Sequence, residues 1–170
     1  MGKKSGRIFY QSVSCLTVDR ISKAERSEVM SRIRGRGNER TETNVIKLFR
    51  NFGIKGWRRH FTIKLAGKTG VASDGTQFKP QVRPDFIFPK SKMALFIDGC
   101  FWHGCPRCYR VPKSRKKFWS AKVLRNKERD AFQRSALRRS GWRVFQVWEC
   151  GLKPKFFELL AMKVKGKGLR

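Results

Sequence analysis

Residues 98–108 read Asp98-Gly99-Cys100-Phe101-Trp102-His103-Gly104-Cys105-Pro106-Arg107-Cys108. Three of the five cysteines of the chain lie in this segment with the spacing C-x4-C-x2-C, and Cys150 follows a later apolar run. Four thiolates can form a closed tetrahedral zinc site, which would hold the loop between them rigid. The alternative is that small, soft cysteines simply fill a core. Their clustering beside glycine and proline favours a structural zinc site held by Cys100, Cys105, Cys108 and Cys150.

The charge of the chain indicates a polyanionic partner. Its 170 residues include 41 Lys and Arg against 12 Asp and Glu, which gives a formal charge of +29. A compact protein tolerates such an excess best when it binds a polyanion, and nucleic acid is the first candidate. An acidic membrane surface is the rival, but the basic residues are spread over every segment and do not form one face of a helix. No apolar run approaches the length of a transmembrane helix.

The first residues and the cysteines predict the compartment. Residues 1–6 lack the apolar core of a secretion signal. An odd number of clustered cysteines fits metal ligation in a reducing compartment better than it fits a disulfide framework. We therefore expect a cytoplasmic protein that is associated with the nucleoid.

The chain divides into three parts by composition. Residues 1–40 carry ten basic and four acidic side chains, and we interpret them as a basic arm that orders on DNA or as a solvated tail. A short helix is expected within this arm, over residues 23–33. Residues 41–152 form the expected single domain, and residues 153–170 form a basic, loosely ordered tail.

The apolar pattern predicts the first elements of the domain. Apolar residues recur with helical period over residues 42–53, which predicts an amphipathic helix. Residues 57–63 are expected to form a strand. Residues 66–82 are rich in Gly, Ser, Thr, Asp and Lys, and predict a long exposed loop. Two short apolar runs, 85–88 and 94–97, are separated by a polar turn and predict a hairpin-like pair of strands.

Two further elements follow the cysteine cluster. Residues 118–139 are expected to form a helix that stops at Gly141, and residues 144–148 a buried strand that leads to Cys150. The order helix, strands, helix, strand indicates the α/β class with a mixed central sheet flanked by helices. Three tryptophans are expected in the core, namely Trp57, Trp142 and Trp148.

Acidic residues are scarce, so their positions are informative. Asp85 opens the first strand of the expected hairpin, Asp98 follows the second strand, and Glu42 begins the first long helix. Carboxylates at strand ends on a positively charged surface can hold a hard cation such as Mg2+, which assists hydrolysis of a phosphodiester. His103 could then accept a proton from the attacking water, and Asp130 could fix the tautomer of His103. Taken alone, Asp85 would be a turn residue that follows a proline.

With these residues the chain resembles the very short patch repair (Vsr) mismatch endonucleases, which are relatives of type II restriction nucleases. The resemblance runs from about residue 19 to residue 152. Its most specific part is Gly-Cys-Phe-Trp-His at 99–103, followed by Trp-Glu-Cys at 148–150. The other matching segments are Arg26-Ser27, Met30-Ser31-Arg32-Ile33-Arg34-Gly35, Arg83-Pro84-Asp85-Phe86, Phe118-Trp119, Arg129-Asp130 and Gly141-Trp142-Arg143-Val144.

The resemblance implies a restriction-endonuclease-like core that nicks one strand of double-stranded DNA beside a T·G mismatch, with Mg2+ as cofactor. Asp85 corresponds to the family's metal-binding aspartate, and Ile97 to the residue whose backbone carbonyl helps to hold the ion. His103 matches the catalytic histidine and Asp130 the acid that pairs with it. Glu42 lies where the family has a supporting acid on its first helix.

Further positions match residues that bind zinc or DNA in the family. The cysteines named above correspond to the structural zinc ligands. Three aromatic residues match those that wedge into the base stack beside the mismatch, where unstacking is cheapest: Phe101, Trp102 and Trp119. Basic residues within 110–129 are expected to grip phosphates, in particular Lys113, Arg115, Lys116 and Lys117.

The chain departs from the family at three places. The best-known members carry histidine where this chain has Asp98, so the role of Asp98 in metal binding or acid–base chemistry is left open. Cys105 replaces a histidine ligand, and the loop from Cys105 to Cys108 is one residue longer, although an all-cysteine site is still sound for zinc. The segment 66–82 is far longer than the turn usual before Pro-Asp. It either alters sequence preference through its basic side chains or is a tolerated insertion.

Two alternatives to mismatch nicking are kept. The same fold could serve as a restriction or mobile-element nuclease that cuts matched DNA, and a non-catalytic zinc-stabilised DNA-binding module would need no catalytic acid. We expect a monomer with a functional link to a DNA cytosine methyltransferase. The recognised bases and their methylation do not follow from the sequence, and Cys15 is interpreted as a spare thiol.

Overall fold

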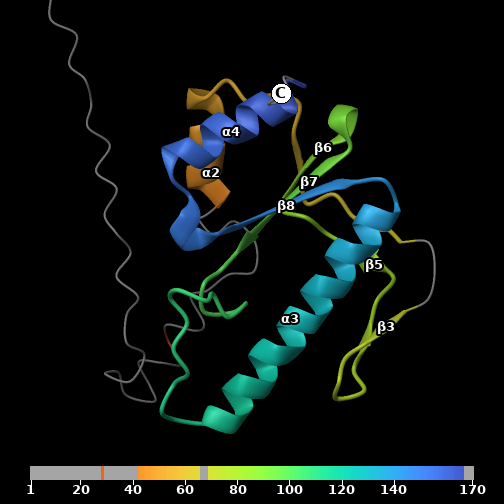
Figure 1. The fold of residues 1–170 in the computed structure, drawn as a ribbon, viewed down its shortest axis with the longest axis vertical. Helices are drawn as coiled ribbons and strands as arrows, with labels where there is room; N and C mark the ends of the chain where they lie inside the picture. Colours follow the sequence, from red (N-terminus) through yellow and green to blue (C-terminus); the bar gives the residue numbers. More distant parts are fainter. Residues whose placement is uncertain (1–27, 29–41, 66–68, 167–170) are drawn as a thin grey trace, which may run out of the picture.

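A four-stranded mixed sheet forms the centre of the protein (Figure 1). The computed structural model describes residues 28, 42–65 and 69–166. The sheet has the order β1-β6-β7-β8, with β1 at Arg58–Arg59, β6 at Phe86–Phe88, β7 at Met93–Asp98 and β8 at Arg143–Trp148. The expected helix over 23–33 lies outside the described residues apart from Glu28, as do Cys15 and almost all of the basic arm.

The hairpin expected from the two apolar runs is confirmed. β6 and β7 pair antiparallel with Phe86 opposite Leu95. A 3-10 turn over Pro89–Ser91 joins the two strands, and Lys92 closes it in the left-handed conformation. All residues of β6 and most of those of β7 are buried, which explains why both strands read as uninterrupted apolar runs.

The strand expected over 144–148 is β8, and it pairs with β7 in parallel. Its expected burial is wrong, because only Val147 is buried and the other residues are half-buried or exposed. Asp98 lies opposite Trp148 in this register. Since parallel strands end at the same edge of a sheet, the segments that follow these two residues leave the sheet side by side. Cys100 and Cys150, each two positions further along, therefore start from matched positions.

Two helices cover one face of the sheet and a third covers the other face (Figure 1). α2 (Asn44–Asn51) and α4 (Pro154–Val164) pack on one face of the sheet. There they form the first hydrophobic core with Phe86, Phe88, Met93, Leu95 and Val147 of the strands. α3 (Lys116–Arg139) covers the opposite face, where its Ala136 and Leu137 join the second core. α2 and α3 confirm the two helices expected from the apolar pattern, and the protein is a mixed α/β fold.

The helix α4 corrects the expectation of a loosely ordered tail. Phe157 and Leu160 of α4 are 0% and 2% exposed, and Phe157 packs edge-on against Phe49 of α2 with ring centroids 6.1 Å apart. Lys155 and Lys163 of α4 are exposed, while its apolar residues Phe157 and Leu160 face the core. The division of the chain at residues 40 and 152 stays a prediction.

The strand expected over 57–63 is interrupted at His60, which has a φ of 53°. Residues before the break form β1, which pairs with β6. Residues after it form β2 (Ile63–Lys64), which pairs with β5 (Gln81–Val82) in a separate two-stranded sheet. The single strand was wrong because a left-handed residue turns the chain between two partners, and periodicity does not reveal such a break.

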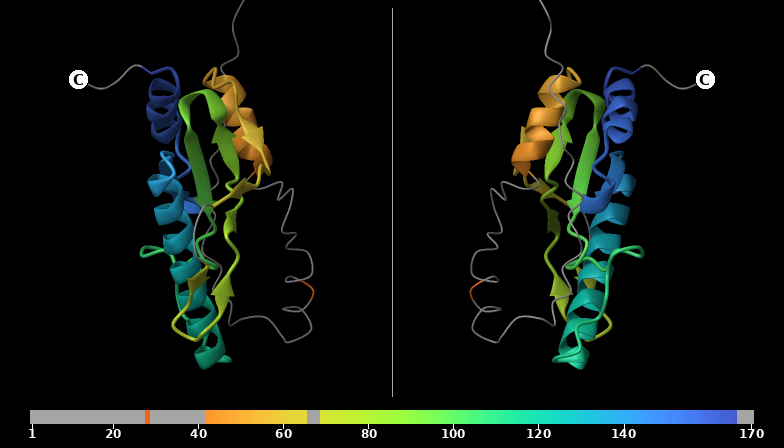
Figure 2. Two further views of the ribbon diagram at one scale, coloured as in Figure 1. Left: turned by 90° about the vertical axis from the view of Figure 1, so that its right-hand side faces the viewer. Right: turned by 90° about the vertical axis from the view of Figure 1, so that its left-hand side faces the viewer.

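The long exposed loop expected over 66–82 is also wrong for its described part. β3 (Gly70–Val71) and β4 (Gln77–Phe78) form a hairpin that runs along α3 at the end of the molecule away from α2 and α4 (Figure 2). Phe78 is buried against Phe132 of α3, with ring centroids 5.9 Å apart. A few apolar residues among many polar ones are enough to anchor this hairpin on the helix.

The expected tryptophan positions hold for two of the three residues. Trp57 packs against the first core and meets Phe86 edge-on at 5.5 Å between ring centroids. Trp142 packs against the second core. Trp148 is half-buried and lines a cavity beside Asp98. No helix of the described residues is long and apolar enough to cross a membrane.

Candidate functional site

The residues singled out in the sequence gather at the edge of the sheet where β7 and β8 end. The loop of residues 99–110 leaves β7 there, and a 3-10 turn over Glu149–Gly151 follows β8. α3 passes beneath this edge on the second face of the sheet (Figure 1). The parallel register of β7 and β8 therefore brings together two parts of the chain about fifty residues apart in sequence.

Four thiols form the first cluster at this edge. The Sγ atoms of Cys100, Cys105, Cys108 and Cys150 all lie within 4.8 Å of one another, and Cys105 Sγ is 3.7 Å from Cys150 Sγ. A tetrahedral zinc ion with Zn–S bonds of about 2.3 Å separates its sulfur ligands by about 3.8 Å. The four cysteines are free thiols, and their spacing fits one metal ion.

The surroundings of Cys105 favour a thiolate. Burial opposes ionisation, but backbone N–H groups of Arg107 and Cys108 lower the pKa of Cys105 to about 7. The Arg107 guanidinium also donates to Cys150 Sγ at 3.5 Å. Cysteine binds metal as a thiolate. The N–H groups of the loop donate to the Cys105 sulfur atom and would stabilise the negative charge of a metal–thiolate centre.

Gly104 fixes the loop against α3. Its φ of 66° lies in the left-handed region, and an added Cβ would come within 2.7 Å of the Val123 side chain and 2.6 Å of Lys127. Both observations require glycine between His103 and Cys105. The cysteine cluster and this close contact together set where the His103 side chain lies.

His103 is paired with Asp130 of α3. Nδ1 of His103 lies 2.5 Å from Asp130 Oδ2, and Asp130 is 7% exposed. Burial alone would raise the pKa of Asp130, but the hydrogen bond from His103 and the charges of His103 and Arg129 outweigh burial and hold that pKa below its usual range. Arg129 also donates to Asp130 Oδ1 at 3.0 Å. Asp130 is thus a buried carboxylate that orients the imidazole ring.

Asp98 is the third member of this cluster. It is 4% exposed, and its Oδ1 lies 4.0 Å from His103 Nδ1. Its Oδ2 accepts hydrogen bonds from Arg134 at 3.1 Å and from the Gln146 side chain. The ligand atoms of Asp98, His103 and Asp130 lie within 4.8 Å of one another and border a cavity of about 250 Å³. The structure therefore assembles these three predicted residues at one place.

Asp85 lies at the neighbouring strand end. Its Oδ2 accepts the backbone N–H of Ile97 at 2.7 Å, one strand away. Burial raises the pKa of Asp85 to about 6, and the carboxylates of Glu42 and Asp98 add to the rise against the opposing Ile97 hydrogen bond. Glu42 and Asp98 are thus both close enough to Asp85 to raise its pKa, although neither Asp85 nor Glu42 joins the Asp98–His103–Asp130 group among the described residues.

Glu42 is held by Arg59 of β1 and by His60, the residue that follows this strand. Its Oε2 lies 3.3 Å from Arg59 Nη1 and 3.3 Å from His60 Nε2. The left-handed conformation of His60 brings its ring to this carboxylate. The expected supporting acid is therefore beside Asp85 and is itself neutralised by a cation.

An aromatic cluster stands on the outer side of the loop. Trp119 meets Phe101 at 5.1 Å and Trp102 at 5.8 Å between ring centroids, and Phe101 meets Trp102 at 5.2 Å. All three are half-buried, and Asn126 of α3 donates to the Trp102 carbonyl at 2.8 Å. The structure places the three predicted aromatics in contact, with part of each surface open to solvent.

Four expected basic residues lie around the start of α3. Arg115 adopts a left-handed conformation just before the helix, and its guanidinium lies 4.8 Å from the centre of the Phe118 ring. Phe118 is 48% exposed. The four side chains are all exposed, namely Lys113, Arg115, Lys116 and Lys117. They form a basic surface next to the aromatic cluster.

Several residues of the site were not anticipated. Asn126, Asp130 and Arg134 are spaced by four on α3 and form one inward polar stripe. Asp130 was recognised alone, yet this spacing on a helix expected to cover a sheet could have pointed to the other two. Gln146, which fixes Asp98, carried no such signal. Arg129, which fixes Asp130, belongs to a matching segment, but its contact with Asp130 was not expected.

The thiol cluster predicts one tightly bound metal ion per chain. Cys150→Ser should lose this ion and lower the free energy of unfolding by at least about 3 kcal/mol, since metal binding and local folding are coupled. Elemental analysis of the purified protein and denaturant unfolding measure both effects. Cys15→Ser, which changes the fifth cysteine of the sequence, should keep the metal and is the matched control. Full metal content in Cys150→Ser would rule out this ligand set.

In Mg2+-free buffer, Asp85→Asn should stabilise the protein at neutral pH. The pKa of Asp85 is about 6 in the folded protein against about 3.9 in an unfolded chain, so the folded state binds this proton more tightly. The favourable contribution of the protonated carboxyl is complete below about pH 4. It is lost as the pH rises through about 6, above which the carboxylate costs up to about 3 kcal/mol.

Chemical denaturation of the wild type and of Asp85→Asn between pH 4 and pH 8 measures this difference, because asparagine keeps an acceptor for Ile97 and carries no charge. Asp74→Asn provides a control of opposite sign. Hydrogen bonds from Thr76 lower the pKa of Asp74 to about 2, so this variant should be less stable than the wild type above about pH 4. The account of Asp85 would be refuted if the difference in unfolding free energy between Asp85→Asn and the wild type were the same at pH 8 as at pH 4.

Comparison with known proteins identifies a family that matches the chain. The family described as DNA mismatch endonuclease Vsr matches residues 18–110, more than half of the chain. The type II nicking enzyme V.XorIIP of Xanthomonas oryzae pv. oryzae is 35% identical over 136 residues, which cover 79% of this chain and 86% of that protein. The matched region includes Asp85, Asp98, His103 and three of the four clustered cysteines.

Two other relatives are matched over shorter segments. The type II nicking enzyme V.NaeI of Lentzea aerocolonigenes is 42% identical over 93 residues, which cover 55% of this chain and 49% of that protein. The DNA mismatch endonuclease Vsr of Escherichia coli is 45% identical over 73 residues, which cover 42% of this chain and 46% of that protein. The matches thus span about half the length of each. From the family match and the long match to the Xanthomonas protein, the chain belongs to the DNA mismatch endonuclease Vsr family.

Proposed function

We propose that this protein is a Mg2+-dependent endonuclease that nicks one strand of DNA beside a T·G mismatch. Its mixed sheet with helices on both faces would be the core of a restriction-endonuclease-like fold. Membership of the family supports an enzyme that acts on DNA, and the formal charge of +29 supports a polyanionic substrate. A monomer, a cytoplasmic, nucleoid-associated location and a functional link to a DNA cytosine methyltransferase belong to the same proposal.

The observation that carries the proposal is the His103–Asp130 pair at the end of β7. Because Nδ1 of His103 faces Asp130 at 2.5 Å, Nε2 is the ring nitrogen that can accept a proton from an attacking water. The buried carboxylate fixes the ring and stabilises the imidazolium that results. Asp98, held by Arg134 and Gln146, adds negative charge 4.0 Å from the same ring. His103 is therefore arranged as a general base.

The carboxylates near His103 suit a magnesium ion. Mg2+ prefers oxygen ligands, and Asp85 with the backbone carbonyl of Ile97 would hold it. Burial, and then the carboxylates of Glu42 and Asp98, raise the pKa of Asp85 to about 6, and a divalent cation would offset this cost of its negative charge. When bound, Mg2+ supplies charge stabilisation for the phosphodiester undergoing hydrolysis.

Zinc is the metal that we assign to the thiol cluster. Four cysteines with no open ligand position are typical of structural zinc sites. The zinc would tie the loop after β7 to the turn after β8 and so hold His103 in place. The chemistry itself would not involve this ion.

The aromatic and basic residues of the site support binding of distorted DNA. Phe101, Trp102 and Trp119 present partly open rings on the loop that carries His103. A mismatched step costs less to unstack than a paired one, so inserted rings would select it. The exposed basic residues at the start of α3 would bind backbone phosphates without reading sequence.

Nicking of a duplex with a T·G mismatch by two variants tests the assignment of residues. His103→Ala should lower the single-turnover rate by about 10²- to 10⁴-fold, the usual contribution of a general base, and should keep its zinc. Asp85→Ala should bind the duplex and cut none of it. Lys90→Ala, in the exposed turn between β6 and β7, should cut at the wild-type rate.

Three outcomes would contradict these roles. Wild-type nicking by Asp85→Ala would show that this residue is not the Mg2+ ligand. Loss of zinc from His103→Ala would make His103 a ligand of the thiol cluster. If the wild type bound the duplex but did not nick it, the protein would be a non-catalytic, zinc-stabilised DNA-binding module.

A further inference from the structure

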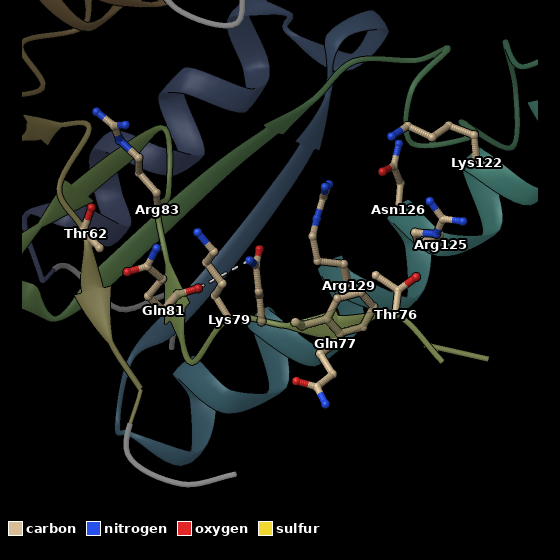
Figure 3. A pocket seen from close by; sticks show the side chains of 12 residues that line it. Thr62, Thr76, Gln77, Lys79, Gln81, Arg83, Lys122, Arg125, Asn126 and Arg129 are labelled. Atoms are coloured by element: carbon tan, nitrogen blue, oxygen red, sulfur yellow. Dashed lines mark hydrogen bonds between the residues drawn. The ribbon is translucent and has the colours of Figure 1, made fainter. Parts of the chain in front are cut away.

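A basic groove lies between α3 and the segment that forms the β3–β4 hairpin and β5 (Figure 3). It encloses about 420 Å³ and is open to solvent. Its twelve lining residues include no acidic side chain. Five of them are basic, namely Lys79, Arg83, Lys122, Arg125 and Arg129. Figure 3 shows these side chains around one opening, some from the strand segment and others from α3.

The hairpin that forms one wall is fixed to α3 and is not a loose loop. Gly70 lies so close to Phe132 that an added Cβ would come within 2.6 Å of the ring. At the tip, Arg125 of α3 pairs with Asp74, with Nε 2.7 Å from Oδ2. The backbone N–H of Ser73 donates to Glu128 at 3.1 Å. Apolar and ionic contacts therefore hold the groove open at a set width.

The charge of the groove is only partly balanced. Arg125 and Arg129 are engaged by Asp74 and Asp130. In contrast, Lys79, Arg83 and Lys122 form no ion pair with any other described residue. Amide side chains stand among the basic ones and can donate further hydrogen bonds. Such a mixture of cations and amides is typical of surfaces that bind nucleic-acid backbones.

The groove adjoins the candidate catalytic site, since residues that line the groove contact residues of that site. Arg129 lines it and also donates to Asp130, the partner of His103. Asn126 lines it and holds the carbonyl of Trp102. Arg83 lines it two residues before Asp85. A strand bound along the groove would therefore pass beside His103 and Asp85.

We infer that this groove binds the backbone phosphates of the DNA segment that flanks the nicked position, so that the inserted hairpin extends the DNA-binding surface. This inference rests on the proposed function. The lining residues of α3 run from Lys122 to Gln133, about 17 Å along the helix axis. Measured along the axis of the duplex, that length corresponds to about five base pairs at about 3.4 Å each. The hairpin therefore contributes to the affinity for DNA and not to the rate of phosphodiester hydrolysis.

The test compares two double variants of the full chain. Lys79→Ala/Lys122→Ala removes two groove cations. Lys90→Ala/Lys155→Ala removes two exposed cations from the β6–β7 turn and α4, away from the groove. Affinity for a duplex with a T·G mismatch and for its matched counterpart is measured by fluorescence anisotropy at several salt concentrations. Nicking is measured separately at saturating DNA.

The groove variant should bind both duplexes at least about tenfold more weakly near 0.1 M salt, and the slope of log K against log salt should fall by about 2. Its nicking rate at saturating DNA should equal that of the wild type. Lys79→Arg/Lys122→Arg, which keeps both positive charges, should bind with the affinity of the wild type. Nicking at the wild-type rate by the alanine variant would show that this variant is folded. The control variant should keep the wild-type slope.

Affinity and slope equal to those of the control variant would overturn the inference, and the groove would then face a different anion or none. A failure of the proposed function has a different signature. In that case the wild type nicks neither duplex, while the comparison of affinities still decides whether the groove binds DNA.

Discussion

The parallel pairing of β7 with β8 is the constraint on which the rest of the site depends. Its register sets Asp98 against Trp148, so Cys100 and Cys150 leave the sheet from equivalent positions and their thiols can meet. The loop that they close carries His103 and two of the three clustered aromatics. A shift of this register by one residue would turn every side chain of β8 to the opposite face. The metal ligands, the general base and the aromatic cluster would then separate together.

The second organising feature is the way α3 distributes charge. One stripe of the helix supplies Asp130 to His103 and Arg134 to Asp98, both nearly buried. The neighbouring stripe presents Lys122, Arg125 and Arg129 to the basic groove. Buried carboxylates each have a cationic or amide partner, as low-dielectric surroundings require. One helix thus fixes the candidate catalytic residues on one side and offers a positive surface for a polyanion on the other.

Much of this could be predicted from the sequence where a strong local signal existed. The apolar runs predicted the strands β6 and β7, the helices α2 and α3 lie where they were expected, and the four clustered cysteines come together. β8 was predicted as a strand, but only Val147 of it is buried. His103 with Asp130 was also expected, and the structure brings them together. The misses have physical causes. The left-handed conformation of His60 turns the chain between two partner strands. The segment of α4 was expected to be a basic tail, although five of the six residues 156–161 are apolar. The β3–β4 hairpin is held by Phe78 among polar neighbours. Gln146 contacts Asp98 through a tertiary contact that no local pattern shows.

The most direct measurement is a nicking assay with Mg2+ on end-labelled duplexes that contain a T·G mismatch or its matched counterpart within randomised flanking sequence. The account predicts that the zinc-loaded protein cuts one strand beside the mismatch, leaves the other strand intact, and spares the matched duplexes. The same products would reveal the preferred flanking bases. Cutting of matched duplexes alone would contradict the mismatch assignment and favour a restriction-type nuclease. Tight binding of both duplexes without cutting of either would contradict the catalytic assignment.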